Sequence, residues 1–414
     1  MRFIIPLMTL AIVVILVFAG CAAPAPTEPT TPTTPTTPTT PTTPTEPTTP
    51  TETTEPEMTE WGLPLNPFGE DLSVKPDGTP YKFAHASIGF VNDWAVCANE
   101  IICSLLRRSG AEVIAYDSQV DVELQVDFID NCISVTHPEA IIVHAVNEPM
   151  LAPSVDNATA AGISCFAYDF EIPSENVVSF AYHDFDGEFG SNLVAEYFVE
   201  RAEAENRELI IYEIWGLRSM LSMTDRHEGF HRVADQCPLI TVVESGGEAY
   251  SDPLTAEVVE AAFPAHPELN AIFHQTGGVG GCISGLRSIG RLFTVDHPDH
   301  VLIAINDTDT RVVEGMRDGY IDAFGSHGSW DLGDVIVKSA LNHVVLGETV
   351  LPVVAIPMSV VTTENIDTLR VFGGVPAVYP LMPEGQWDLW PAMDTSEIGV
   401  PTPTKALRME LKGY

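Results

Sequence analysis

Basic side chains are scarce in this sequence. It holds 19 Lys and Arg residues against 58 Asp and Glu residues, and its formal net charge is −39. Proteins that bind nucleic acid or anionic membrane surfaces need clusters of Lys and Arg. We therefore expect this protein to bind neither nucleic acid nor an anionic membrane surface. A solvated acidic surface, suited to saline or acidic surroundings, is the simplest explanation of the charge. A cationic ligand is the alternative that global charge leaves open.

Cysteine patterns that would indicate metal or redox chemistry are also missing. No C-x-x-C occurs, and beyond Cys21 the spacing is irregular, so the cysteines predict no metal site. The remaining cysteines are Cys97, Cys103, Cys132, Cys165, Cys237 and Cys282. Most lie within apolar stretches, so the pattern is compatible both with buried free thiols and with disulfides. A bridge from Cys97 or Cys103 to Cys132 is the pair to test.

The glycine-rich stretch 276–281, TGGVGG, lacks the features of a nucleotide-binding loop. It holds neither a complete G-x-G-x-x-G nor a Gly-Lys-Ser/Thr ending, so we expect no nucleotide and no other cofactor. Because these glycines open a predicted helix after a strand, we expect them to make room in a ligand cleft. Ordinary turn chemistry is the alternative.

The amino-terminal stretch has the pattern of a bacterial secretion signal. A basic residue at position 2 precedes an almost wholly apolar run over 3–18, and Ala19-Gly20-Cys21 resembles a lipobox. We therefore predict a lipoprotein signal peptide over 1–21, with Cys21 as the lipidated first residue of the mature chain. A simple signal-anchor helix is the alternative.

Residues 22–56 consist almost entirely of Thr, Pro and Glu, with TTP repeated. Such a segment has nothing to bury and favours an extended polyproline-like conformation, which predicts a disordered tether. At about 3.1 Å per residue it would reach about 100 Å from the membrane. An irregular segment rich in turn signals follows over 57–81.

From Lys82 the hydrophobic pattern alternates between strand and helix. The predicted strands are 82–91, 112–116, 140–144, 164–168, 177–180, 209–214, 240–244, 271–273, 301–305, 320–324 and 353–357. The predicted helices between them are 94–110, 122–135, 151–161, 188–204, 220–234, 253–265, 279–289, 310–318 and 331–345. This alternation predicts an α/β fold with parallel strands and right-handed crossovers, and the strands are too many for one ordinary sheet. We expect two similar lobes and a C-terminal extension over 366–414.

Polar residues follow the first predicted strand. Asn92 and Asp93 break the apolar run, and Trp94 then begins the helical pattern. Because ligands bind at the carboxyl ends of parallel strands, these residues are the first candidates for a binding site.

The same Asn92-Asp93-Trp94 turn resembles the Asn-Pro-aromatic turn of ribose-binding-protein-like sugar-binding proteins in the periplasmic binding protein type I superfamily. Further similar segments follow in the family's order over 82–367. They are AIIVHAVNEPMLAPSVDNATAAGISCFAYDFE, VVSFAYHDFDGEFG, RHEGFH, AIFHQ and AINDTDTRVVEGMRDGYIDAF. Each segment alone is a weak match, and their order and spacing make the resemblance strong.

The resemblance implies two Rossmann-like lobes, each a parallel sheet flanked by helices, joined by a three-segment hinge with a ligand cleft between them. The chain is expected to cross from one lobe to the other near His183, Gly328 and Pro352. Lobe one then comprises 82–183 and 328–352, and lobe two comprises 184–327 and 353–365. Such proteins close around a ligand by hinge bending.

The family's binding positions fall on residues that suit a sugar or polyol. Carboxylate and Asn side chains form hydrogen bonds with pairs of sugar hydroxyls. The Arg guanidinium donates two parallel hydrogen bonds, and an aromatic face packs against the apolar side of the sugar ring. The expected ligand-binding residues are Asn92, Asp93, Trp94, Asp169, Phe170, Arg226, Tyr250, Gln275, Asp307 and His327. Phe170 stands where pentose binders carry Arg, 276–278 replaces an Asn-Asp pair, and Ala95 replaces a second aromatic. We therefore expect a ligand other than ribose: another sugar, a polyol, a nucleoside or a similar small polar molecule.

The resemblance implies an extracytoplasmic solute-binding lipoprotein that is not an enzyme. We expect a monomer anchored to the cell membrane through Cys21, facing the periplasm or cell exterior, that delivers ligand to an ABC transporter permease. A sensor that reports to a membrane receptor or kinase is the alternative.

One motif would indicate an enzyme instead. Residues 227–231 read HEGFH and satisfy the H-E-x-x-H pattern of zinc metalloproteases, in which two histidines one helical turn apart bind the metal. The motif needs a third ligand, Gly229 lies inside it, and Arg226 just before it matches the binding-protein signature. We expect a coincidental, partly exposed histidine pair and no metal site, with a zinc hydrolase as the remote alternative.

Overall fold

The computed structural model describes residues 71–90, 92–184 and 190–370, together with Phe68, Met393, 395–404 and Arg408. All of them belong to the second of two units, Glu55–Tyr414. The predicted signal peptide, Cys21, the tether and most of the C-terminal extension lie outside the described residues. Among the described helices, every one is too short or too polar to cross a membrane.

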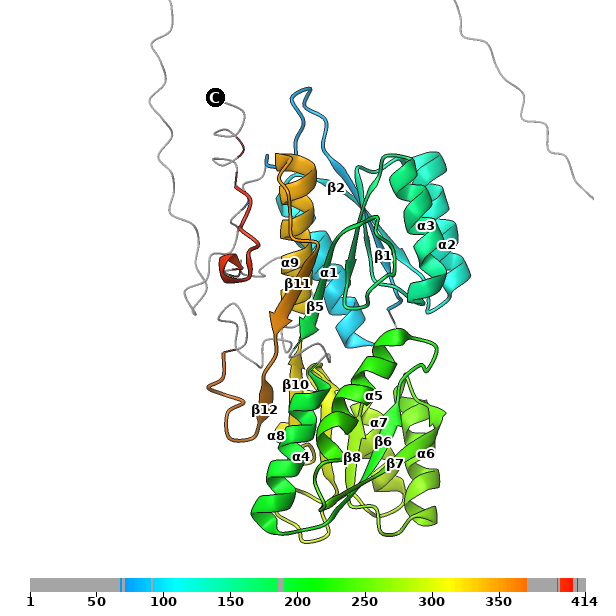
Figure 1. The fold of residues 1–414 in the computed structure, drawn as a ribbon, viewed down its shortest axis with the longest axis vertical. Helices are drawn as coiled ribbons and strands as arrows, with labels where there is room; N and C mark the ends of the chain where they lie inside the picture. Colours follow the sequence, from blue (N-terminus) through cyan, green and yellow to red (C-terminus); the bar gives the residue numbers. More distant parts are fainter. Residues whose placement is uncertain are drawn as a thin grey trace, which may run out of the picture. The chain divides into compact units, whose positions relative to one another are not determined.

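The first lobe is built on a six-stranded parallel sheet with the order β11-β5-β4-β3-β1-β2 (Figure 1). Its strands are β1 (Lys82–Ser87), β2 (Glu112–Asp117), β3 (Ala140–Val143), β4 (Ser164–Tyr168), β5 (Val177–Asp184) and β11 (Val353–Pro357). Its helices are α1 (Asp93–Arg108), α2 (Val122–Asn131), α3 (Glu148–Ala160) and α9 (Ser329–Leu341), with short π-helical turns η1 (Cys132–Thr136) and η2 (Asn342–Leu346). Helices α1 and α9 pack together on one face, and α2 and α3 pack together on the other.

The second lobe repeats this plan with the strand order β12-β10-β9-β8-β6-β7. Its strands are β6 (Leu209–Trp215), β7 (Ile240–Glu248), β8 (Ala271–His274), β9 (Leu302–Asp307), β10 (Ala323–His327) and β12 (Val360–Thr362), and only β12 runs antiparallel to its neighbour. Its helices are α4 (Ser191–Glu205), α5 (Leu221–Ala234), α6 (Asp252–Ala265), α7 (Val279–Ser288) and α8 (Thr310–Arg317). A short 3₁₀ turn, η6 (Ser396–Ile398), lies in the described part of the C-terminal extension. The predicted two-lobed α/β fold is confirmed.

Local sequence explains where these elements begin and how they pack. The central strands are continuous apolar runs, as in AIIV of β3, because helices cover both faces of each sheet. Helix α1 begins after Asn92, whose side-chain oxygen accepts a hydrogen bond from the Ala95 N–H at 2.9 Å. Asp309 caps α8 in the same way. Caps at strand ends therefore turn the chain sharply and leave polar side chains at the sheet edge.

Two predicted boundaries are wrong. Strand β11 pairs with β5 of the first sheet, so the third crossing follows Pro357 instead of lying near Pro352, and 353–357 belong to lobe one. Strand β10 runs three residues beyond the predicted end at Phe324, which makes His327 the last residue of a strand. The sheet that β11 joins depends on a strand far away in the sequence, and the added residues of β10, Gly325-Ser326-His327, include no β-branched side chain that would indicate a strand.

All six cysteines within the described residues are buried free thiols, so the bridge from Cys97 or Cys103 to Cys132 is absent. Burial raises the pKa of the Cys103 and Cys165 thiols to about 12. These side chains act as small apolar core residues.

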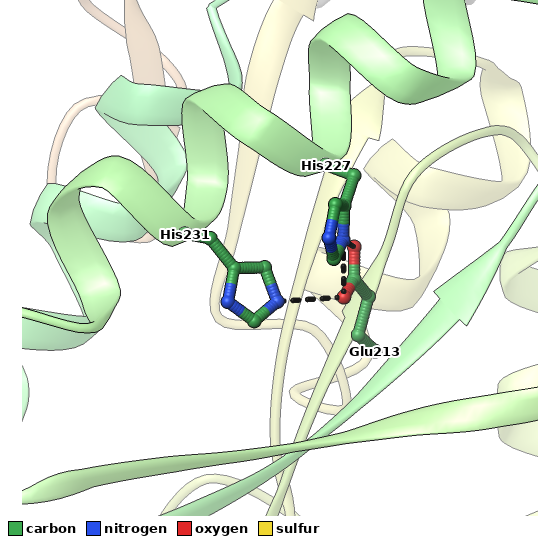
Figure 2. A group of neighbouring side chains, drawn as sticks. All are labelled: Glu213, His227 and His231. Carbon is green, nitrogen blue, oxygen red and sulfur yellow. Dashed lines mark hydrogen bonds and ion pairs between the residues drawn. The ribbon is translucent and has the colours of Figure 1, made fainter.

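Helix α5 packs over the second sheet and directs two histidines toward a strand. His227 and His231 lie one turn apart and face Glu213 of β6 (Figure 2). The histidine pair expected to be coincidental thus has a carboxylate partner from a different element.

Candidate functional site

The predicted site residues converge where the carboxyl ends of the two sheets meet. A cavity of about 10 Å³ lies there, which is room for about one water molecule. It is lined by Ile88, Asn92, Trp94, Ala95, His144, Asp169, Phe170, Arg226, Tyr250 and Asp307. A larger open hollow of about 600 Å³ lies between α4 and residues 358–365, but the charged, buried groups gather at the small cavity. The small cavity is therefore the better candidate for the site.

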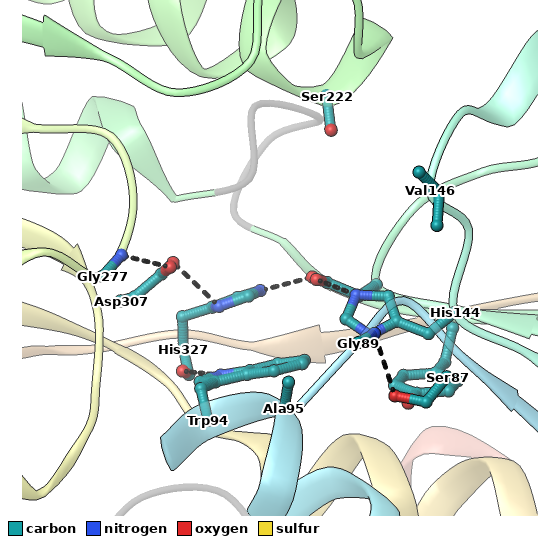
Figure 3. Close-up of polar contacts among 12 residues, drawn as sticks. Ser87, Gly89, Trp94, Ala95, His144, Val146, Ser222, Gly277, Asp307 and His327 are labelled. Carbon is teal, nitrogen blue, oxygen red and sulfur yellow. Dashed lines mark hydrogen bonds and ion pairs between the residues drawn. The ribbon is translucent and has the colours of Figure 1, made fainter. Parts of the chain in front are cut away.

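His327 lies between two carboxylates, one from each lobe, and Figure 3 shows its contact with Asp307. Its Nε2 is 2.8 Å from Oδ1 of Asp169, which follows β4, and its Nδ1 is 3.1 Å from Oδ1 of Asp307, which ends β9. Burial alone would lower the pKa of His327, but the charges of Asp169 and Asp307 raise it to about 9. The imidazole is therefore a buried cation at neutral pH, and it holds the two lobes together.

Arg226 supplies a second buried cation from α5. Its Nη1 lies 3.0 Å from Oδ1 of Asp307 and donates a hydrogen bond of 2.6 Å to the carbonyl of Gln275. Burial would raise the pKa of Asp307, but Arg226 and His327 hold it below its usual range. The Gly277 N–H donates to the other oxygen of Asp307 at 2.9 Å. The carboxylate of Asp307 is thus charged and fixed on both oxygens.

Asp169 has a strained backbone and two imidazole partners. Its φ of 66° is in the left-handed region, where non-glycine residues are uncommon. His144, which follows β3, places its Nε2 3.1 Å from Oδ2 of Asp169. Burial opposes ionisation, yet His327 and His144 keep the pKa of Asp169 well below its usual range. Asp169 is therefore a charged acceptor aimed into the cleft.

Aromatic rings cover this polar network. Trp94 stacks on His327 with the ring centroids 5.4 Å apart and an angle of 9° between planes, and its Nε1 donates to the His327 carbonyl at 2.9 Å (Figure 3). The ring centroid of His144 lies 5.3 Å from that of Trp94 and 5.1 Å from that of Phe170. Trp94 thus offers a flat face across the lobe boundary, and in this closed arrangement His327 occupies that face.

The lobes also touch beside the cavity. Ser222 at the start of α5 donates a hydrogen bond of 3.2 Å to Oε1 of Glu148 at the start of α3. The Asn147 side chain donates to the Ser219 carbonyl at 3.4 Å. Burial raises the pKa of Glu148. These contacts hold the cleft shut independently of His327.

The structure brings most of the predicted residues together. Asn92, Trp94, Asp169, Phe170, Arg226, Tyr250 and Asp307 line the cavity, and His327 bridges it. Gln275 is different, because its Nε2 donates to Glu213 at 2.7 Å and its Oε1 accepts from the Gly216 N–H at 3.2 Å. Its side chain faces away from the cavity, and only its carbonyl reaches Arg226. The side chain of Asp93 lies outside what the structure describes.

The glycines of 276–281 serve a purpose other than the expected one. A Cβ on Gly281 would lie 2.3 Å from the carbonyl oxygen of Asp252, and one on Gly280 would lie 2.5 Å from its carboxylate. A Cβ on Gly278 would lie 2.6 Å from Oγ1 of Thr255. These glycines permit close packing of α7 against α6, and only Gly277 contacts the site. For Gly278, Gly280 and Gly281, the expectation that the stretch makes room in the cleft is wrong.

His144 is the main site residue outside the predicted set. It follows the apolar strand β3 directly and reads as a continuation of it. Its signal was its position, because a polar residue at the carboxyl end of a parallel strand is a site candidate. Among the described residues, the group suited to a metal ion lies outside the cavity, at Glu213, His227 and His231.

Comparison with known proteins agrees with this architecture. Residues 83–349 match the family model described as periplasmic binding protein domain. The ribose import binding protein of Bacillus subtilis (strain 168) is 20% identical over 259 residues, which cover 62% of this chain and 79% of that protein. The D-apiose import binding protein of Actinobacillus succinogenes is 23% identical over 253 residues, which cover 58% of this chain and 76% of that protein.

Solved structures share the fold. A galactofuranose binding protein aligns with a TM-score of 0.61 at 16% identity, over 69% of this chain and 96% of that one. An ABC transporter solute binding protein from Bacillus halodurans C-125 with bound myo-inositol aligns with a TM-score of 0.60 at 22% identity, over 69% and 95%. The family match covers most of the described chain, and the resemblance seen in the sequence is confirmed. The chain belongs to the periplasmic binding protein family, whose members are extracytoplasmic solute-binding proteins.

Proposed function

We propose that this protein captures a small polar, sugar-like ligand between its lobes and delivers it to an ABC importer. The observation that carries the proposal is the network of Asp169, Arg226, Asp307 and His327 at the lobe boundary, with the Trp94 ring beside it. Two relatives are named for import of ribose and D-apiose, which supports a sugar-like ligand.

The chemistry of the network fits a polyhydroxylated molecule. Each ionised carboxylate accepts hydrogen bonds from adjacent hydroxyls, Arg226 donates to ring or hydroxyl oxygens, and the Trp94 face covers apolar C–H groups. Since the cavity has room for about one water, the lobes must separate and His327 must leave the Trp94 face before a ligand enters. The ligand then replaces the imidazole as the bridge between lobes.

Phe170 supports a ligand other than ribose. Its ring is buried against His144, at the position where the sequence resemblance predicts an arginine in pentose binders. With an apolar ring at this position, one side of the cleft lacks the hydrogen-bond donors that an arginine would supply. The ligand we propose has an apolar edge at that position, as a deoxysugar or a nucleoside would.

The wider setting follows from the amino-terminal sequence. We propose a lipid anchor on Cys21 and a tether that holds the binding unit away from the membrane, facing the periplasm or cell exterior. The partners are the ligand and a transporter permease, the protein acts as a monomer, and it binds its ligand without transforming it.

A thermal-shift screen of the mature chain against pentoses, hexoses, polyols and nucleosides tests the proposal. A true ligand at 100 times its Kd adds about 2.7 kcal/mol to the free energy of unfolding. Titration calorimetry on hits then compares the wild type with Trp94→Ala and Asp307→Asn, which we expect to lose binding. Binding that survives both substitutions, or no stabilisation by any compound class, contradicts the proposal.

A further inference from the structure

A second cluster of ionisable side chains lies in lobe two, outside the cleft. Glu213 comes from the middle of β6, and His227 and His231 come from successive turns of α5 (Figure 2). Residues four apart lie on one face of a helix, so both imidazoles point at the same strand. The three side chains therefore meet at one place between α5 and β6.

The ligand atoms are already at coordination spacing. Nδ1 of His227 lies 3.1 Å from each Glu213 oxygen, and Nε2 of His231 lies 3.1 Å from Oε2. All three ligand atoms fall within 4.8 Å of one another. Metal bonds of about 2.0–2.2 Å at tetrahedral angles place ligand atoms roughly 3.4 Å apart. A cation can therefore be accommodated by small shifts of side chains.

Neighbouring groups orient the ligands as they do around metal ions in proteins. His231 Nδ1 lies 3.0 Å from Oδ1 of Asp235, so its Nε2 is the nitrogen that faces the cluster. The Gln275 Nε2 donates to Oε1 of Glu213 at 2.7 Å, which leaves Oε2 turned toward the imidazoles. The Trp215 ring packs against His227 with centroids 4.5 Å apart. Such outer contacts fix the ring orientation and the tautomer of metal-binding histidines.

The cluster combines a buried anion with an open side. Glu213 is fully buried, whereas the His227 and His231 side chains are 23% and 21% exposed. Both histidines and the Gln275 side chain lie within hydrogen-bond distance of the Glu213 carboxylate. A buried carboxylate needs a positive partner, and a cation can enter from the side of the histidines.

We infer that Glu213, His227 and His231 bind a divalent transition-metal ion such as Zn²⁺, with water completing the coordination. Two imidazoles and one carboxylate suit Zn²⁺, Co²⁺, Ni²⁺ and Cu²⁺ rather than Mg²⁺ or Ca²⁺. The third ligand comes from a strand, and Glu228 within HEGFH is exposed. The site is thus a metal-binding feature of lobe two that needs no hydrolase chemistry.

The test uses the tag-free mature chain after EDTA treatment and dialysis. Co²⁺ titration followed by visible absorption should give the d–d bands of a low-symmetry site, saturating at one equivalent, and Zn²⁺ should displace the Co²⁺. The variants Glu213→Gln and His231→Gln should bind Co²⁺ at least about 100-fold more weakly, because removing a ligand costs more than the roughly 10–100-fold loss on removing an orienting group.

Two further variants keep the test independent of folding. Asp235→Asn alters an exposed residue whose carboxylate contacts Nδ1 of His231, the nitrogen turned away from Glu213, and it should weaken Co²⁺ binding by about 10–100-fold. His266→Gln removes an exposed histidine that pairs with Glu268 at 3.3 Å, and it should leave binding unchanged. Circular dichroism confirms that each variant is folded.

Three results would overturn the inference. One is the absence of d–d bands at one equivalent of Co²⁺. Another is equal affinity of wild type, Glu213→Gln and His231→Gln. The last is a thiolate-to-cobalt charge-transfer band in the near ultraviolet, which would assign the metal to cysteines instead.

Discussion

Histidines meet carboxylates in two regions of this molecule, and the two arrangements have opposite consequences. In the cleft, one imidazole stands between Asp169 and Asp307, and both of its nitrogens face a carboxylate. In lobe two, a pair of imidazoles shares the single carboxylate of Glu213. The cleft supplies its own cation and spans two lobes, so it must open before a ligand enters. The lobe-two cluster lies within one lobe and is open to solvent on the side of its histidines, so an ion can enter it with only small shifts of side chains.

The largest effect is expected from breaking the buried network in the cleft. Arg226→Met leaves Asp307 buried with one cation fewer, and removing one partner of a buried pair costs about 3–5 kcal/mol. Urea unfolding should show this loss, and ligand binding should disappear. Arg317→Met is the matched control, because Arg317 pairs with Asp367 where the side chains are 50% and 79% exposed. That pair should contribute less than about 1 kcal/mol. Similar losses for both variants would mean that the cleft network is no stronger than a surface pair.

A pH titration sharpens the role of the cleft imidazole. The pKa of His327 rises from 6.5 to about 9 on folding, so its stabilising effect is complete below pH 6.5 and is lost as the pH rises through about 9. The ligand-free protein should lose up to about 3 kcal/mol over this range. The charged or titratable groups that face His327 are Asp169, Asp307, Arg226 and His183. Both aspartates stay ionised throughout, because the pKa of each lies below its usual range.

The matched variant is His327→Gln, whose stability should be nearly flat over the same pH range. Denaturant unfolding at half-unit pH intervals measures both proteins. A wild-type profile as flat as that of the variant would show that the imidazole carries no charge in the closed cleft.

The smallest effect tests whether the cleft contacts oppose opening. Ser222→Ala removes a hydrogen bond between the lobes to Glu148, which is worth about 1 kcal/mol. Ligand dissociation should become about fivefold faster, measured by stopped-flow tryptophan fluorescence. Ser174→Ala, which loses a contact with Asp156 inside lobe one, should leave the rate unchanged. Equal rates for wild type and Ser222→Ala would show that this contact is absent in the ligand-bound form.

Local sequence patterns predicted the lobes and most strands because burial on both faces leaves uninterrupted apolar runs, as in β3 and β4. They placed Asp169 and Asp307 correctly at strand ends, where polarity changes abruptly. The end of β10 was missed because Gly325-Ser326-His327 has none of the β-branched residues that signal a strand. The sheet to which β11 belongs was missed because its partner, β5, lies far away in the sequence.

The metal-binding cluster was beyond sequence reasoning for a related reason. The histidine pair was visible at helical spacing, but Glu213 sits inside the strand LIIYEIW, where a single carboxylate gives no periodic signal. Only the packing of α5 over β6 joins them. A motif search therefore finds two ligands and stops, whereas the fold supplies the third.

The buried thiols make the molecule convenient for fluorescence spectroscopy. The six described cysteines are shielded from reagents, so a thiol-reactive dye will attach to an introduced cysteine once Cys21 is replaced by serine. Val135 in lobe one and Leu254 in lobe two are 65% and 46% exposed and suit a donor and an acceptor dye. Energy transfer between the two labels would report each opening and closing event in single molecules, without altering the cleft.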